Sequence, residues 1–264
     1  MSATIPRPGP SPLPVGRRPG LRSLLVMVRA EARMVARDTA GLIIPFGLPL
    51  LILLTSAQAA SQEEILRGRS ALDLFVMPLV MVMVLAMSGV LNMPSFLAYY
   101  RRTGILRRLA VTPVSPAMVL IAQVIVNILQ SALGITLAAV VARLLFGAKP
   151  PIDLGIALGV LVLTAAAMYA LGMVVAALAP TPNSAVAIGL VLFLGLGATG
   201  GMFGGRGSLP EPVAELGAVL PFGAGVDALS AAWAGQSIEV GSLVSLMVTI
   251  AVGGVVAAAL FRWE

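Results

Sequence analysis

Long apolar stretches separated by short polar segments organise most of this sequence. Six of the stretches match the length that a helix needs to cross the roughly 30 Å hydrocarbon core of a bilayer. Their continuous glycine- and alanine-rich runs lack the apolar-polar alternation of a barrel strand, so the spans must be helices. The pattern therefore predicts an all-α integral membrane protein with six transmembrane helices. The predicted spans are residues 39–57, 73–95, 116–146, 152–179, 184–204 and 241–261.

Three segments outside the spans also have a distinct pattern. Residues 1–19 hold six prolines and no long apolar run, which predicts a disordered cytoplasmic tail. Residues 20–37 place apolar side chains on one flank of a helix and arginines on the next, as in helices that lie in the headgroup layer; a solvated basic helix is the alternative. Prolines interrupt residues 208–235, which predicts a re-entrant pair of short outer helices between spans five and six. The arginines of the interfacial helix are Arg22, Arg29 and Arg33.

Composition and charge place the chain in the membrane and orient it. The sequence is 59% hydrophobic and 11% charged, far more apolar than a soluble domain. With the amino terminus in the cytoplasm, the predicted inner segments carry twelve basic and three acidic residues, and the outer segments five basic and eight acidic. This asymmetry follows the positive-inside rule, so the net charge of +6 is an orientation signal and does not indicate nucleic-acid binding. We expect a multi-pass protein of the cell (inner) membrane with both termini cytoplasmic.

Several kinds of chemistry are missing from the sequence. Without cysteine or histidine it has no disulfide, thiol or imidazole chemistry and no usual zinc site. No GxxxxGK[ST] loop is present, so any use of ATP requires a separate ATPase chain. Every Asp, Glu, Arg and Lys falls at or beyond a predicted span end, which disfavours an ion-coupled carrier because such carriers usually keep an ionisable group near the midplane. Backbone carbonyls can bind sodium, so the ion-coupled carrier stays as the alternative.

A basic segment between spans two and three carries the most specific pattern. Residues 99–113 begin Tyr-Tyr-Arg-Arg, contain a second arginine pair, and place Ile105, Leu106 and Leu109 on one helical face. The run GILRRLAVTPVSP resembles the signature loop of the type-2 ABC transporter permeases, particularly the drug-resistance (daunorubicin-type) branch. Arg107 stands where many members of that family carry a glutamate.

The resemblance implies a function and partners. Residues 20–264 would form one permease domain of an ABC exporter, which catalyses no covalent chemistry and binds no cofactor, while ATP and Mg²⁺ bind to a partner ABC ATPase. A second permease subunit, identical or not, would complete the transporter, and the substrate would be an amphipathic drug or lipid. A permease for polysaccharide or another substrate is the alternative. The residues expected to contact the ATPase are Arg101, Arg102, Gly104, Ile105, Leu106, Arg107, Arg108, Leu109, Thr112 and Pro113.

Polar and glycine residues inside the spans give further candidates. Gln123, Asn127 and Gln130 share one face of the third span, where polar groups contact protein or water; hydrogen bonding between helices is the alternative to a substrate role. Small residues repeated every fourth position allow close helix approach, which predicts a packing face, within the subunit or at a dimer seam, at Gly197, Gly201 and Gly205. The resemblance also implies that spans two and five flank the central route, which adds apolar candidates there; ordinary core or lipid-facing side chains are the alternative. Together the candidates for the substrate pathway are Met77, Met81, Ser88, Asn92, Gln123, Asn127, Gln130, Phe193 and Met202.

Overall fold

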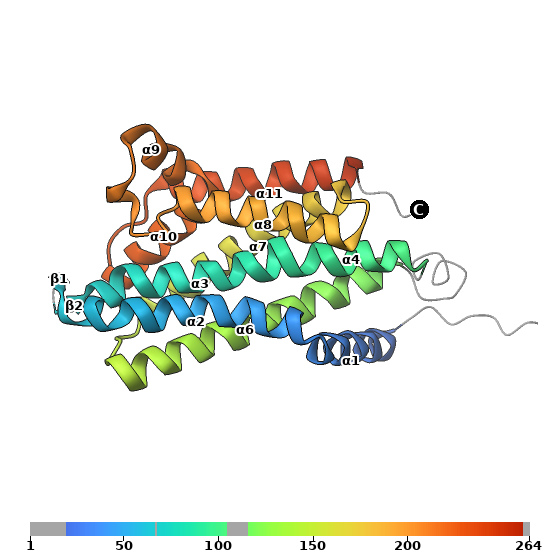
Figure 1. Cartoon of the computed structure of the whole chain (residues 1–264), viewed down its shortest axis with the longest axis horizontal. Helices are drawn as coiled ribbons and strands as arrows, with labels where there is room; N and C mark the ends of the chain where they lie inside the picture. Colours follow the sequence, from blue (N-terminus) through green and yellow to red (C-terminus); the bar gives the residue numbers. More distant parts are fainter. Residues whose placement is uncertain (1–19, 67, 105–115, 261–264) are drawn as a thin grey trace, which may run out of the picture.

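The computed structural model of the chain describes residues 20–66, 68–104 and 116–260 (Figure 1). Six helices in this part of the chain are long and apolar enough to cross a bilayer, which confirms the predicted all-α fold with six spans. The helices run along the long axis of the molecule (Figure 1). In chain order the spans lie in α2 (Thr39–Gln62), in the composite second span (Leu72–Arg102), and in α6 (Pro116–Phe146), α7 (Leu154–Leu178), α8 (Pro182–Thr199) and α11 (Val240–Leu260).

The shorter elements lie at the two ends of this bundle (Figure 1). At one end, called here the α1 end, α1 (Leu21–Arg37) precedes the first span. At the other, the α9 end, α9 and α10 meet at a bend of 79° and form the predicted helical pair between spans five and six. This end also holds an antiparallel two-stranded hairpin, in which Glu64 is opposite Ser70. The elements of the α9 end are β1 (Glu64–Leu66), β2 (Arg69–Ser70), the 3-10 turn η3 (Arg206–Ser208), α9 (Glu211–Val219) and α10 (Pro221–Ala234).

The second span is the central helix of the bundle. Within its most apolar window 89% of the residues are buried, against 17% to 44% for the other spans. It contacts α2, α6, α7, α8 and α10. Two π-helical turns widen it locally and redirect its side chains. Its successive parts are η1 (Leu72–Val76), α3 (Met77–Ala86), η2 (Met87–Asn92) and α4 (Met93–Arg102).

Glycines allow close helix packing around η2. A Cβ atom added to Gly172 of α7 would lie 1.9 Å from the carbonyl oxygen of Gly89, and one added to Gly189 of α8 would lie 2.5 Å from that of Val90. Neither distance leaves room for a side chain. Helix association in a bilayer depends on such close packing, because lipid tails are as apolar as the helix surfaces. These positions, rather than the predicted glycine repeat, bring α7 and α8 onto the second span.

Side-chain caps fix where several helices begin. The Asp38 carboxylate accepts a hydrogen bond from the Gly41 N–H at 3.1 Å, which starts α2 where α1 ends. Asp153 does the same for α7, accepting from the Ile156 N–H at 2.9 Å. Thr181 and Ser184 form a reciprocal capping box at the start of α8. Each cap satisfies an N–H group that the helix itself leaves unpaired.

Three predicted span ends differ from the structure by five residues or more. The second span was expected to end at residue 95, whereas α4 continues the helix to Arg102. The first span was expected to end at residue 57, followed by a polar loop, whereas α2 continues to Gln62 and the hairpin follows. The fifth span was expected to reach residue 204, but α8 ends at Thr199.

The early end of α8 also makes the predicted glycine packing face wrong. Gly201 and Gly205 have φ of +92° and +81°, in the region that favours glycine, and they form turns after the helix. They therefore share no helical face with Gly197. A Cβ at Gly197 would instead contact Met202 in the following turn, 3.0 Å from its sulfur.

The basic segment at residues 99–113 is described only at its start. Tyr99 to Arg102 form the last turn of α4, not the beginning of a separate helix, and Gly104 forms a turn with φ of +68°. The predicted ATPase contacts Ile105, Leu106, Arg107, Arg108, Leu109, Thr112 and Pro113 lie outside the described residues, as does the predicted tail, residues 1–19.

Candidate functional site

The α1 end presents exposed arginines close to the start of the basic segment. Arg22, Arg29 and Arg33 are exposed along α1, and Arg102 is exposed at the end of α4. Arg101 points inward instead. Its guanidinium donates to the carbonyl oxygens of Ala176 and Ala179, at 2.5 Å each. These carbonyls belong to the C-terminal end of α7, where a cation is favoured, so Arg101 joins the second span to the fourth.

Apolar contacts place α1 against the bundle. Val35 packs with Phe96 of α4 and Val126 of α6, and Met34 packs with Tyr100 and Val119. The start of α1 extends beyond this contact: Leu21 is 74% exposed and Leu25 is 59% exposed, on the same helical face as Val28 and beside the exposed arginines. An apolar strip next to a basic strip is typical of a helix in the headgroup layer.

A buried carboxylate lies between α1 and the bundle. Glu31 is only 5% exposed. Its Oε2 accepts hydrogen bonds from the Tyr100 hydroxyl, on the last turn of α4, and from Gln123 Nε2 of α6 at 2.6 Å. Burial raises the pKa of Glu31, and the hydrogen bonds from Tyr100 and Gln123 partly oppose this.

The polar residues predicted on the third span bind to other parts of the same chain. Gln123 binds Glu31, and Asn127 Nδ2 donates to the Gln123 carbonyl at 2.8 Å. Gln130 Nε2 and Asn92 Nδ2 both donate to the Gly41 carbonyl, at 2.7 and 2.6 Å. All four polar residues are buried. For Gln123, Gln130 and Asn92 the geometry is that of hydrogen bonding between helices, the alternative to a substrate role, whereas Asn127 binds within α6.

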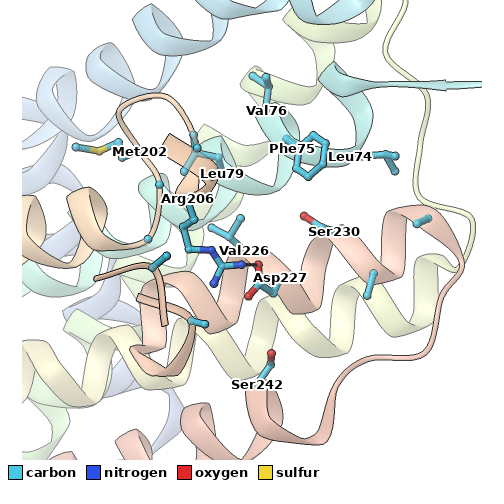
Figure 2. Close-up of a pocket in the computed structure, with 18 of the residues that line it drawn as sticks. Leu74, Phe75, Val76, Leu79, Met202, Arg206, Val226, Asp227, Ser230 and Ser242 are labelled. Carbon is cyan, nitrogen blue, oxygen red and sulfur yellow. Dashed lines mark hydrogen bonds and ion pairs between the residues drawn. The ribbon is translucent and has the colours of Figure 1, made fainter. Parts of the chain in front are cut away.

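A groove of about 1230 Å³ opens at the α9 end, between α2, η1, α9, α10 and the turn after α8 (Figure 2). One wall is apolar, and the other carries an ion pair between Arg206 and Asp227. Figure 2 shows the two charged side chains meeting beside Val226. Ser230 and Ser242 add hydroxyl groups. The apolar wall includes Ile52, Leu74, Phe75, Val76 and Leu79.

The predicted apolar candidates divide between this groove and the core. Met202 lines the groove. Met77, Met81 and Phe193 lie in the core, where the Phe193 ring meets that of Phe222 edge to face, with centroids 6.5 Å apart. The predicted polar candidate Ser88 is also fully buried. Of the nine predicted pathway residues, Met202 is the one that borders this groove.

Sequence reasoning missed Glu31, Tyr100, Arg206 and Asp227. A signal for Glu31 was present: it is the one acid within an otherwise basic helix, and it shares a helical face with Val28 and Val35. Arg206 and Asp227 are 21 residues apart, and nothing in their spacing predicts the pair. The described ranges of the chain contain no group of acidic residues that could hold a metal ion.

Comparison with known protein families identifies the family of this chain. A family model described as "ABC-2 type transporter" matches residues 22–234, which is more than half of the chain. No curated protein matches the sequence.

Proposed function

The chain belongs to the ABC-2 type transporter family as a membrane permease subunit, and from this premise we propose that it exports an amphipathic drug or lipid using a separate ATPase. ABC-2 permeases generally pair with an ABC ATPase, which binds ATP and Mg²⁺. The observation that carries the proposal is the α1 end, where exposed arginines adjoin the end of a second span whose most apolar window is 89% buried. A force that the ATPase applies at this end would be transmitted through the second span to the helices packed around it.

Force transmission would follow the described contacts. The ATPase would hold the segment after Arg102, with α1 as a second contact. Arg101 connects the end of α4 to α7 through two hydrogen bonds, so α7 would move with the second span. Two permease subunits, identical or different, would pair with two ATPases and expose a central cavity to each side of the membrane in turn. The drug-resistance branch of the family is part of the proposal.

The groove at the α9 end supports an amphipathic substrate. Its apolar wall suits a hydrocarbon or aromatic body, and the Arg206–Asp227 pair with nearby hydroxyls suits a polar head. Phe75 is the aromatic residue among the residues that line it. Stacking of successive sugars, as a polysaccharide permease would use, has little support from these walls.

The test of ATPase coupling uses Leu106→Asp and Leu109→Asp. Because both leucines lie on the apolar face of the predicted coupling helix, a carboxylate there should abolish co-purification of the partner ATPase. Leu154→Asp is a matched control: this leucine is 61% exposed in the first turn of α7 at the other end, where an acid is favoured. Undiminished ATPase binding by both leucine variants would contradict the proposal.

A second measurement separates ATP-driven from ion-coupled transport. Cells are loaded with a fluorescent lipophilic dye, depleted of ATP, and held at a fixed ion gradient. Export that stops under these conditions supports the ATP-driven permease, and export that continues favours the ion-coupled carrier.

A further inference from the structure

One acid of α1 contributes hydrogen bonds to the contact of this helix with the bundle. All the other charged side chains of α1 are arginines, and these are exposed. Glu31 faces the opposite way, into the boundary between three elements: α1 supplies the carboxylate, α4 the Tyr100 hydroxyl, and α6 the Gln123 amide. Tyr100 is two residues from the end of α4, where the basic segment starts. The acid therefore joins α1 to the inner ends of the second and third spans at one point.

The surroundings of Glu31 hold no charge that would balance it within the described ranges. On α4, Arg101 binds α7, and Tyr99 and Arg102 are exposed. The α6 helix has Arg143, at its far end, as its charged residue, and α2 has no ionisable side chain. Asp38, two turns along from Glu31, caps α2. Neutral donors hold the carboxyl group, and among the residues that the structure describes it forms no ion pair.

We propose that Glu31 is a positioning residue, which fixes α1 to the inner end of the second span so that α1 and the start of the basic segment move as one body. The use of this connection rests on the proposed function, because both elements are the expected contacts of the ATPase. A helix attached only by apolar contacts can slide or rotate on the bundle. Two directional hydrogen bonds to one carboxylate oxygen fix its register.

Protonation should change how firmly α1 is held. Because burial raises the pKa of Glu31, the docked state binds a proton more tightly than the undocked one. Docking is therefore strongest below the ordinary pKa of glutamate and weakens as the pH rises through the raised value. Glu31→Gln keeps an acceptor oxygen for both donors and is always neutral, so its docking should not depend on pH. Glu31→Ala leaves Tyr100 and Gln123 without their acceptor, so its docking should be weak at every pH.

The experiment measures the position of α1 in the complete complex of permease and ATPase in lipid nanodiscs. The chain has no cysteine, so two spin labels can be placed by substitution alone. Ala30→Cys on α1 and Ile121→Cys on α6 are both exposed. Ile121→Cys with Leu194→Cys on α8 is the control pair, which does not involve α1. Electron–electron double resonance then gives the distance distribution for each pair at several pH values.

For the Ala30–Ile121 pair in the wild type, we expect a single narrow distance distribution at acidic pH. A second, broader population should appear as the pH rises. Glu31→Gln should stay narrow throughout. Glu31→Ala should be broad throughout, with the ratio of docked to undocked α1 lowered about tenfold. Tyr100→Phe should fall between these two, because it removes one donor. The control pair should be unchanged in all of them, and ATP hydrolysis by the complex should fall with the docked fraction.

Two outcomes separate this inference from the proposed function. Identical distributions for the Ala30–Ile121 pair in the wild type, Glu31→Gln and Glu31→Ala at every pH, with ATPase bound, would overturn the positioning role alone. Failure of the wild-type chain to bind an ATPase contradicts the proposed function. The pH dependence of the Ala30–Ile121 distances in Glu31→Gln, compared with the wild type, tests the positioning role even where Glu31→Ala does not fold.

Discussion

At the scale of single residues, one of the closest backbone contacts is made by two glycines. Gly89 and Gly172 bring the second span and α7 so near that a Cβ at Gly172 would overlap a carbonyl oxygen, 1.9 Å away. Backbone atoms form both sides of this contact, so neither side can move aside as a side chain would. Packing here depends on the absence of one methyl group.

Gly172→Ala should therefore separate α7 from the second span. We expect a loss of about 1–3 kcal/mol in the free energy of unfolding from overpacking, seen as a lower midpoint of thermal aggregation in detergent. Gly159→Ala is the matched control in the same helix, because a Cβ there has nothing within 4 Å. It should be neutral or stabilise α7 slightly, since alanine has the higher helix propensity. Equal midpoints for the two variants would contradict the interpretation.

Which polar residues would be buried could be predicted from the sequence, but not their partners. Gln123, Asn127 and Gln130 share a face of an apolar helix, and lipid disfavours such groups, so their contact with protein follows directly. Gln123, however, binds Glu31, 92 positions earlier. A helix period relates residues three or four positions apart and gives no information over that distance. The pair depends on how α1 lies against α6, which is a property of the tertiary structure.

At the scale of elements, helices were predictable and their ends less so. Apolar length alone identifies the six spans, and the proline-interrupted pair corresponds to α9 and α10. The end of α8 was missed because Gly200 to Gly205 are as compatible with an apolar helix as with the turns that they form. The π-helical turns η1 and η2 have no periodic signature, because one extra residue per turn leaves the apolar pattern of a fully buried helix unchanged.

The hairpin at the α9 end gives a prediction about element docking. The buried Asp73 carboxylate accepts from the backbone N–H of Lys149 at 2.7 Å and of Ser70 at 3.3 Å, which joins the turn before α7 to β2. Asp73→Ala leaves the Lys149 N–H unpaired. Loss of this hydrogen bond to a charged group should speed protease cleavage within residues 147–153 about tenfold, measured by gel after limited digestion.

Glu64→Ala is the control for that experiment. Glu64 lies in the same hairpin, is exposed, and forms no ion pair in the part of the chain that the structure describes. Its removal should leave the cleavage rate as in the wild type. Equal rates for Asp73→Ala and Glu64→Ala would show that Asp73 does not hold the turn.

At the scale of the whole molecule, the charge asymmetry of the sequence predicts which end faces the cytoplasm. Twelve basic residues in the predicted inner segments favour the α1 end as cytoplasmic. Gln236→Cys and Thr103→Cys, both exposed and at opposite ends, test this in a chain with no other cysteine. A membrane-impermeant maleimide should label Gln236→Cys on intact cells and Thr103→Cys only after the membrane is opened. The reverse labelling would invert the orientation.

The enclosed position of the second span limits how the protein can respond to force. A peripheral helix can tilt away from a bundle, but one packed against α2, α6, α7, α8 and α10 can only slide along its axis, turn about it, or move together with these helices. Backbone contact between Gly89 and Gly172 makes sliding costly, because the second span and α7 interlock there. Conformational change in this subunit should therefore be the displacement of the whole bundle against the proposed second subunit, and a small molecule bound between two such subunits should stop it more effectively than one bound within the bundle.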